Sequence, residues 1–150
     1  MNDKLLFGRE KMGLNQEEFG KLFCPIRTAK TVSGWEKNHD SIPLEVILMY
    51  ANISNDSLDY LFEISKDAIK YSKFEIDKVR LGQKLKEERL KKNLSQKEIA
   101  DLLNTTQSVV SRWENGKTLI SIDFFIDFIN HFEGLSIDEL FDRVKLENKK

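Results

Sequence analysis

A short run of polar side chains near residue 110 has the chemistry needed to read the edges of DNA bases. Its members are uncharged or basic, and none is acidic: Gln107, Ser108, Ser111 and Arg112. Glutamine can form two hydrogen bonds with adenine, arginine can do so with guanine, and serine can bond to several base edges. Val110 and Trp113 lie three residues apart and are expected to face a core, which leaves the polar run on the outer face of a helix. The pattern therefore favours nucleic-acid recognition.

Other side chains that often carry chemistry stand alone in this sequence. His39 and His131 have no carboxylate or second histidine at ligand spacing, and Cys24 is the single cysteine. No phosphate-binding glycine loop, nucleophile elbow or pair of catalytic carboxylates is present in the sequence. We therefore expect no metal, no cofactor and no enzymatic activity, and a cysteine that is packed in a turn.

Short helices are the elements expected to position the polar run. Apolar residues at spacings of two to five predict a first helix over residues 77–92: Val79, Leu81, Leu85 and Leu90. Serine and threonine caps, two of them in capping boxes, predict four more helices, which begin after Ser95, Thr106, Ser121 and Ser136. Gly116 supplies the left-handed residue that commonly ends a helix. The polar run lies on the third of these five helices.

The same pattern occurs twice in the chain. The dipeptides Trp35-Glu36 and Trp113-Glu114 end two similar segments, and residues 9–23 match residues 89–103 at an offset of 80. The offset is 78 at the Trp-Glu pairs and 79 farther on, where SLDYLF (57–62) aligns with SIDELF (136–141). A repeat of this length suits a compact domain better than a solenoid unit. The sequence thus predicts two copies of one small module.

The segment LSQKEIADLLNTTQSVVSRWENGK, residues 94–117, resembles the helix-turn-helix of the phage-repressor family of the Cro and XRE type. The resemblance covers essentially all of residues 80–141 and is weaker in the first copy. It implies an all-α protein with two tandem five-helix lambda-repressor-like helix-turn-helix domains, and the lysine- and acid-rich stretch between them favours a short, partly helical connector. The expected boundaries are 1–62 for a degenerate helix-turn-helix domain, 63–78 for the connector, 79–142 for a DNA-binding domain and 143–150 for a charged tail.

The resemblance also implies which side chains would read bases. Gln107, Ser108 and Arg112 would contact base edges in the major groove, and Ser111 shares their face. The methyl group of Thr106 would be available to a thymine. These side chains would carry the sequence specificity.

Flanking residues would hold the DNA backbone by the same resemblance. Gln96, at the start of the second helix, would bind a phosphate with help from the helix dipole. Asn115 and Lys117 would contact the backbone just past the recognition helix. Arg89 and Glu114 occupy the places of an inter-helix ion pair, so we expect their role to be structural.

The first copy keeps this pattern in a degraded form. Ala29 and Gly34 stand where Gln107 and Arg112 stand in the second copy, so two base-reading side chains are missing. Cys24-Pro25 lengthens the turn before the third helix. Three roles remain open for this copy: it grips the DNA backbone, reads a few bases, or contacts a protein. Its candidate DNA contacts are polar or basic: Gln16, Thr28, Lys30, Ser33 and Lys37.

The fourth helix of each copy carries more apolar side chains than one small core requires. Residues 44–53 and 122–132 are both of this kind. We expect the excess to pack either between the two copies, as a pseudo-twofold unit, or between two chains, as a homodimer. A homodimer would read a palindrome and a single chain an asymmetric site, with half-sites about ten base pairs apart.

The composition fits a cytoplasmic protein with double-stranded DNA as its partner. Residues 80–117 hold nine Lys or Arg against five Asp or Glu, whereas residues 118–150 hold four against seven. Such polarity can orient a domain on a polyanion while the chain stays near neutral. No uncharged stretch approaches the roughly 20 residues of a membrane helix, so no membrane partner is expected.

Two functions are consistent with these observations. The first is a sequence-specific transcriptional regulator, a repressor of prophage or mobile-element type, which reads the major groove with the helix over residues 106–115. The alternative is a protein-interaction regulator, such as an antirepressor, antitoxin or inhibitor, which uses the helix-turn-helix fold to bind a protein partner, with the first domain as the candidate contact surface.

Overall fold

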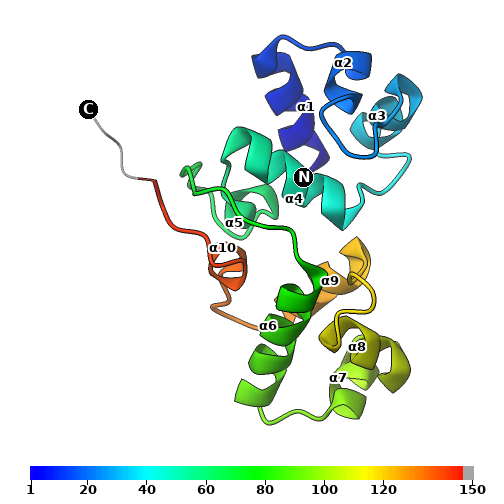
Figure 1. The fold of residues 1–150 in the computed structure, drawn as a ribbon, viewed down its shortest axis with the longest axis vertical. Coiled ribbons are helices and arrows are strands. Elements are labelled where there is room, and N and C mark those ends of the chain that lie inside the picture. The colour runs from blue at the N-terminus through cyan, green and yellow to red at the C-terminus, as the bar shows by residue number, and fades with distance from the viewer. Residues whose placement is uncertain (147–150) are drawn as a thin grey trace. The chain divides into compact units, whose positions relative to one another are not determined.

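The computed structural model describes residues 1–146, which form ten α-helices and two isolated β-bridges. The all-α prediction is confirmed. The chain divides into two compact units, whose helices are labelled in Figure 1. The second unit is Glu75–Asp142, and the first comprises residues 1–74 together with the described residues 143–146. No helix within residues 1–146 is both long and apolar enough to cross a membrane.

The second unit contains five helices: α6 (Lys78–Lys91), α7 (Gln96–Leu102), α8 (Gln107–Glu114), α9 (Ile122–Asn130) and α10 (Ile137–Leu140). Their starts are those predicted from the caps. At α7 the Ser95 hydroxyl accepts from the Glu98 amide at 3.0 Å while the Glu98 carboxylate accepts from the Ser95 amide at 3.0 Å. Thr106 caps α8 through the Val109 amide at 3.3 Å. Gly116 has a φ of 70°, the left-handed conformation predicted for it.

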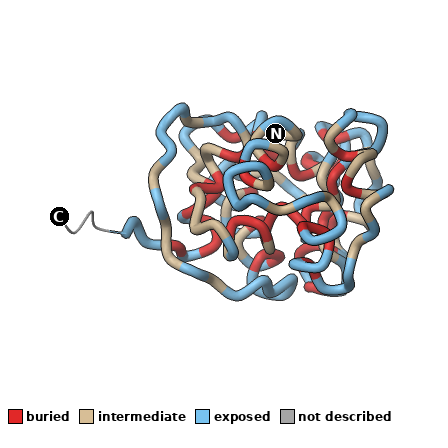
Figure 2. Tube along the Cα trace, turned by 90° about the horizontal axis from the view of Figure 1, so that it is seen from above, coloured by how far each residue is buried: buried red, intermediate tan, exposed pale blue. Residues whose placement is uncertain are grey.

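The core of the second unit forms where α8 meets α6 and α7. Val110 and Trp113 are buried on the inner face of α8, as their spacing predicts. Gly82 on α6 has no room for a side chain, because an added Cβ would contact the main-chain oxygens of Trp113 and Glu114. The two helix backbones therefore approach closely, and this fixes the position of α8. Figure 2 shows the buried positions along the chain in red.

Not every predicted core position of α6 is buried. Leu81 and Leu85 are buried, but Val79 is 48% exposed and Leu90 52% exposed. The buried face of α6 consists of Leu81, Gly82, Leu85 and Arg89, so it is continued by a paired arginine and not by Leu90. The predicted apolar stripe was therefore too long at both ends.

The first unit also contains five helices: α1 (Asn2–Met12), α2 (Gln16–Gly20), α3 (Ala29–Glu36), α4 (Leu44–Ser54) and α5 (Leu58–Leu61). Asn15 and Glu18 form the predicted capping box of α2. Thr28 caps α3 through the Thr31 amide at 3.2 Å. Val32 and Trp35 are buried on α3, so the indole of each copy belongs to its core.

The predicted partly helical connector is wrong, because no helix lies between Phe62 and Asp77. The chain is instead extended there and pairs with the end of α4. The Tyr71 amide donates to the Asn55 carbonyl at 2.8 Å, and Asp56 forms a β-bridge with Lys70. These distant partners satisfy backbone groups that a local helix would otherwise satisfy, so they override the helical composition of the segment.

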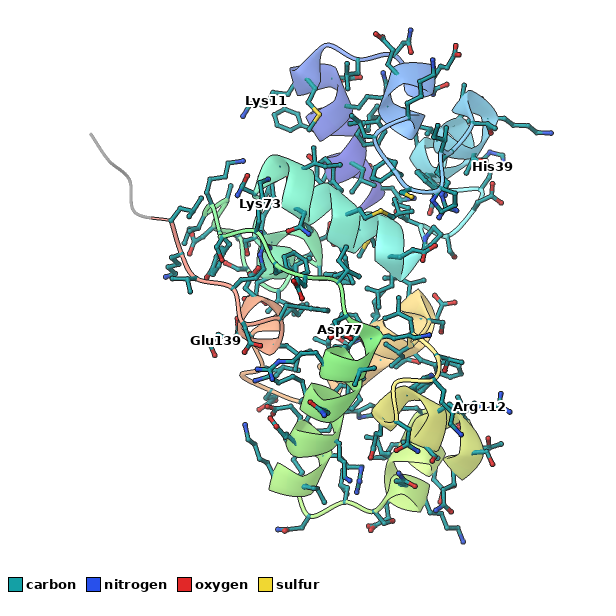
Figure 3. All side chains as sticks on the ribbon, viewed as in Figure 1. Lys11, His39, Lys73, Asp77, Arg112 and Glu139 are labelled. Carbon is teal, nitrogen blue, oxygen red and sulfur yellow. The ribbon has the colours of Figure 1, made fainter. Side chains whose placement is uncertain are left out.

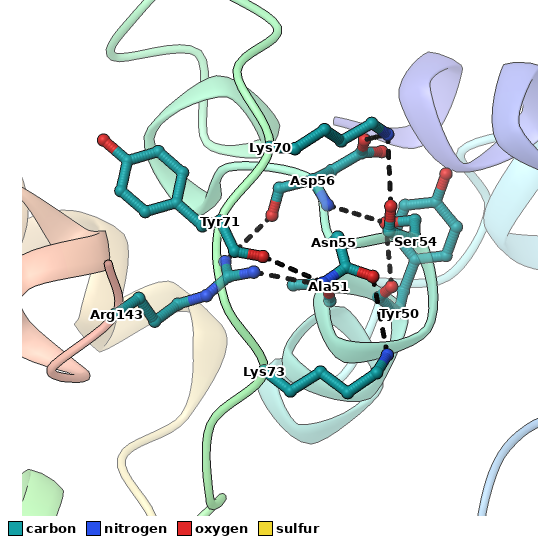
Figure 4. A network of polar contacts seen from close by, with 9 residues as sticks. All are labelled: Tyr50, Ala51, Ser54, Asn55, Asp56, Lys70, Tyr71, Lys73 and Arg143. Carbon is teal, nitrogen blue, oxygen red and sulfur yellow. Dashed lines mark hydrogen bonds and ion pairs between the residues drawn. The ribbon is translucent and has the colours of Figure 1, made fainter. Parts of the chain in front are cut away.

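Residues 143–146, predicted to begin a charged tail, instead pack against the first unit. Arg143 is buried in the first unit, where it donates to the carbonyls of Ser72 at 2.9 Å and Asp56 at 2.8 Å. Its guanidinium lies 4.8 Å from the ring centroid of Phe74. The Ser72 amide donates to the Val144 carbonyl at 2.8 Å. The chain thus leaves the first unit at Phe74 and returns to it at Arg143. Figure 4 shows Arg143 reaching toward Asp56 and Ala51. Residues 147–150 lie outside the described part of the chain.

Candidate nucleic-acid interface

The outer face of α8 carries the predicted base-reading side chains. Thr106, Gln107, Ser108 and Arg112 are exposed, and Ser111 is half-buried beside them. The first turn of α8 holds no acidic residue, and Arg112 lies in its last turn. Figure 3 shows the Arg112 side chain pointing away from the ribbon. The free backbone amides at the start of α8 and its polar face are therefore both open to a ligand.

Two glutamines link the start of α7 to the start of α8. The Gln107 amide nitrogen lies 3.5 Å from the side-chain oxygen of Gln96, and the Gln96 amide nitrogen donates to the Glu114 carboxylate at 3.2 Å. Gln96 is half-buried and Gln107 is exposed. The contact holds both side chains at one edge of the helix-turn-helix, so a group bound by Gln96 would also orient Gln107.

A buried ion pair fixes the crossing of α6 and α8. Arg89 donates to both carboxylate oxygens of Glu114 at 2.8 Å, and its third nitrogen donates to the Leu94 carbonyl at 2.7 Å. The hydrogen bonds to Glu114 raise the pKa of Arg89 above its ordinary value. Both side chains are buried. Such a fork of parallel bonds sets the geometry as well as the energy of the contact, which is the structural role expected for this pair.

The residues past α8 form the other edge of the surface. Asn115 and Lys117 are exposed, and the Asn115 amide donates to the Ser111 hydroxyl at 3.1 Å. The Lys78 ammonium lies 3.4 Å from the Lys117 carbonyl. Lys78 was not among the predicted contacts, because its closeness to Lys117 depends on how the start of α6 packs near the end of α8. Its charge adds to that of Lys117 at the same edge.

The first unit repeats the structural part of this arrangement. Arg9 pairs with Glu36 at 2.8 Å and donates to the Leu14 carbonyl at 2.9 Å. Gln16 donates to Glu36 at 3.4 Å, as Gln96 does to Glu114. The framework that holds α7 against α8 is therefore also present around α2 and α3.

The predicted contacts of the first unit lie on or beside α3. Thr28, Lys30 and Lys37 are exposed, whereas Ser33 is half-buried. The Thr28 hydroxyl is 3.0 Å from the Thr31 hydroxyl, so it is already engaged within the helix. Two lysines are thus the main charged groups that this face offers to a polyanion.

An acidic side chain occupies the place of the missing arginine in the first unit. A Cβ at Gly34 would collide with the carboxylate of Asp40. The amides of His39 and Asp40 donate to the Gly34 carbonyl at 2.9 and 3.2 Å, which holds this loop over the helix. A negative charge therefore lies where Arg112 lies in the second copy. The glycine was visible in the sequence, but the carboxylate beside it comes from a loop whose path the sequence did not reveal.

Other chemistry-bearing residues are dispersed. Within residues 1–146 no three His, Cys, Asp or Glu side chains gather in a way that could hold a metal ion. Cys24 is exposed, so the expectation that it packs in the turn is wrong. Pro25 and Ile26 after it are exposed as well, whereas Phe23 before it is buried.

The geometry of α6 to α10 agrees with a comparison to known families. Residues 85–140 match the helix-turn-helix family. The match supports a DNA-binding transcription regulator of the XRE type, a class that is regulatory and not typically enzymatic. It covers only the second unit and therefore does not extend the family to the first. No curated protein and no solved structure matches the chain.

Proposed function

We propose that the chain is a sequence-specific, double-stranded DNA-binding repressor that reads the major groove with α8. The observation that carries the proposal is the exposed, acid-free face of Gln107, Ser108 and Arg112 on a helix held by the buried Arg89–Glu114 pair. A base-reading helix must present forked donors and acceptors from a fixed position, and both conditions are met here. Repression follows from occupying a promoter.

The flanking residues act as backbone contacts in this proposal, except that the methyl of Thr106 is available to a thymine. Gln96 flanks the helix start, and Asn115, Lys117 and the added Lys78 flank its end. The two groups lie at the two ends of α8, so they bracket the base-reading face. Phosphate contacts on both sides would set the orientation of the helix in the groove.

The first unit is proposed to grip DNA weakly or to contact a protein, and not to read bases. Asp40 next to Gly34 supports this division, because a carboxylate at that place repels phosphate and cannot donate to guanine. Gln16, Thr28, Lys30, Ser33 and Lys37 would then hold backbone at most. The same observation favours the second candidate function, in which the first unit docks a protein partner of the antirepressor or antitoxin kind.

Selection of bound sequences from random duplex DNA tests the proposal. The full-length protein is incubated with the pool at near-physiological salt, where non-specific binding is weakened by counterion competition. An enriched motif is expected. A palindrome would indicate a homodimer led by the second unit, and an asymmetric bipartite site would indicate that both units read DNA. Binding that enriches no motif and vanishes as salt rises would overturn specific recognition in favour of a protein partner.

A further inference from the structure

A cavity in the first unit lies between α1, the end of α4 and the extended chain after α5. Its volume is about 390 Å³, which lies in the range of small-molecule sites. It belongs to the first unit alone and is not part of the surface formed by α7 and α8. Its lining combines large apolar side chains with lysines, a pairing that the DNA-binding proposal does not use.

The apolar part of the cavity comes largely from α1. Phe7 is 62% exposed and Met12 36% exposed, so both large side chains are left in water at its rim. Tyr50 closes it from α4, and its hydroxyl lies where a side chain at Gly8 would be. Burial, and then the carboxylate of Asp56, raise the pKa of the Tyr50 phenol, so it stays a hydrogen-bond donor. Exposed aromatic and thioether groups around a concave site are a favourable surface for an apolar ligand.

The charge of the lining is positive. Three lysines, Lys4, Lys11 and Lys70, face one carboxylate, Asp56. Lys70 is paired with Asp56 at 2.6 Å and Lys4 with Glu63 at 3.3 Å. Lys11 has no carboxylate of residues 1–146 within ion-pair distance. The cavity therefore offers one cation that can accept an anionic group of a ligand.

The second unit contains a matching groove that shows what the fold itself requires. This groove has a volume of about 360 Å³ and includes Lys84 and Lys91, which correspond to Lys4 and Lys11 at the repeat offset of 80. Four of its lining residues are charged where the first unit has an uncharged residue. Glu87, Glu88 and Lys92 stand in place of Phe7, Gly8 and Met12, and Glu139 in place of Tyr60.

The lysines of the second groove have partners in the second unit, Lys84 in Asp142 at 3.1 Å. Lys91 pairs with Glu88 at 2.9 Å, and the Lys92 ammonium lies 5.2 Å from the centroid of the Phe132 ring. The two grooves use equivalent helices, so the helices do not demand apolar side chains at these positions. Phe7 and Met12 are instead two exposed apolar side chains at the rim of one cavity, and a ligand with an apolar body would cover them together.

We propose that the first-unit cavity binds a small organic anion with an apolar body, of the aromatic or medium-chain aliphatic carboxylate class. The apolar body packs on Phe7, Met12 and Tyr50, and the carboxylate pairs with Lys11. A short apolar body matches the cavity volume, and an anion matches its excess of lysines. The proposal does not depend on DNA binding, because it concerns the first unit alone.

Titrations of the full-length protein test this site with two probes. 8-Anilinonaphthalene-1-sulfonate is followed by fluorescence, and decanoate, kept below its micelle threshold, is followed by displacement of that probe. Both are expected to bind saturably. Phe7→Glu places at residue 7 the side chain found at residue 87 and is expected to weaken both probes by about tenfold or more, since it removes apolar contact and adds a like charge.

A charge variant and a matched control complete the design. Lys11→Gln is expected to weaken decanoate by about fivefold while leaving neutral decanol unchanged. Lys91→Gln, at the corresponding position of the second groove, is expected to change neither ligand. Absence of saturable binding to the unmodified protein overturns the proposal. Equal binding by Phe7→Glu, or equal loss of decanoate and decanol in Lys11→Gln, overturns it as well.

Discussion

At the scale of single residues, the two units keep the same framework and differ in what the framework presents. Arg89–Glu114 and Arg9–Glu36 are both forked pairs, each joined by a glutamine from the preceding helix. The exposed position that holds Arg112 in the second unit holds Gly34 in the first, with Asp40 against it. The framework contacts are therefore shared by the two units while the exposed side chains differ, and each set can be tested by itself.

Replacing Arg112 by alanine is expected to remove recognition at one base pair. Arg112 is exposed on α8, and within residues 1–146 its side chain forms no hydrogen bond that would hold the fold together. The loss on a selected site should be about 1–3 kcal/mol, with relaxed specificity at that position. Fluorescence anisotropy with the selected duplex and a single-base variant measures both effects.

Lys117→Ala is the matched control for Arg112→Ala. It should weaken all duplexes alike and reduce the slope of log K against log salt by about one unit, because a phosphate contact carries no sequence information. If Arg112→Ala also weakened every duplex equally, direct readout by that side chain would be wrong.

Glu114→Ala is expected to destabilise the second unit strongly. It leaves the buried Arg89 guanidinium without the Glu114 carboxylate, whose two oxygens each accept from it at 2.8 Å. Breaking one side of a buried ion pair costs about 3–5 kcal/mol. Urea unfolding followed by circular dichroism measures this loss. The double variant Arg89→Met with Glu114→Leu should recover most of it, and a single variant as stable as the parent would contradict the structural role.

The carboxyl of Asp142 is expected to titrate below its ordinary range. Hydrogen bonds from Arg80 and Lys84 lower the pKa of this group below its ordinary value. Because the folded pKa is depressed, the stabilisation is present at pH values above the ordinary pKa of an aspartate and is lost as pH falls through the folded pKa. Carbon-detected NMR titration of Asp142 measures the pKa, and Arg80→Gln should move it upward. An unchanged titration in that variant would show that the arginine has no influence on the carboxyl.

At the scale of the helices, close approach of α6 and α8 decides how the recognition surface is held. An alanine in an exposed helix is normally more stable than a glycine by about 0.5–1 kcal/mol. Gly82→Ala is expected instead to lower the free energy of unfolding, since the added Cβ would contact main-chain oxygens of α8. Overpacking of this kind costs about 1–3 kcal/mol. Thermal unfolding of the variant and the parent shows whether the substitution lowers or raises the stability.

Gln83→Ala is the neighbouring control for Gly82→Ala, because Gln83 is exposed on the same helix. It should leave stability nearly unchanged. A stabilised Gly82→Ala protein would mean that α6 and α8 can separate freely, and the fixed position proposed for the recognition helix would be lost.

Local signals explain which helices could be predicted. Ser95, Thr106 and Gly116 act through hydrogen bonds or backbone angles within a few residues, so the starts of α7 and α8 and the end of α8 follow from the sequence. The burial of Leu81 but not Leu90 depends on which face of α6 meets α8. That choice is set by tertiary packing, which apolar spacing alone does not contain.

The candidate recognition face was predictable because it, too, depends on a local signal, the helical spacing of apolar residues. Val110 and Trp113 define the buried side of α8, so the exposure of Gln107 and Arg112 follows from helical periodicity. Asp40 beside Gly34 was not predictable, since it depends on a loop that folds back over α3. Distant contacts were thus the part of the site that the sequence left open.

At the scale of the whole molecule, the second unit is an insertion between two segments of the first. The departing chain ends at Phe74 and the returning chain begins at Arg143. Inside the first unit these segments are joined by the Ser72–Val144 and Leu146–Lys70 backbone hydrogen bonds, at 2.8 and 2.9 Å. Neither end of the second unit is therefore a free tether, in contrast to two domains joined by one linker.

Arg143→Ala is expected to release the returning segment. It removes charged hydrogen bonds to the Ser72 and Asp56 carbonyls, an effect of about 1.5–3 kcal/mol for bonds to a charged group. The loss should fall on the first unit, because every one of these partners lies there. Hydrogen exchange followed by mass spectrometry measures this directly: the amides of Ser72 and Leu146 should exchange faster, whereas those of α7 and α8 keep their protection.

The control for Arg143→Ala is Lys145→Ala, which changes an exposed residue of the same segment and should leave exchange unaltered. Arg143→Lys is informative as well, because one ammonium cannot reach carbonyls that a planar guanidinium reaches in different directions. It should restore only part of the protection. Unchanged exchange at Ser72 and Leu146 in Arg143→Ala would mean that backbone pairing alone holds the segment. Loss of protection in α7 and α8 as well would mean that the two units unfold as one, so that a change in the first unit would also alter the stability of the recognition helix.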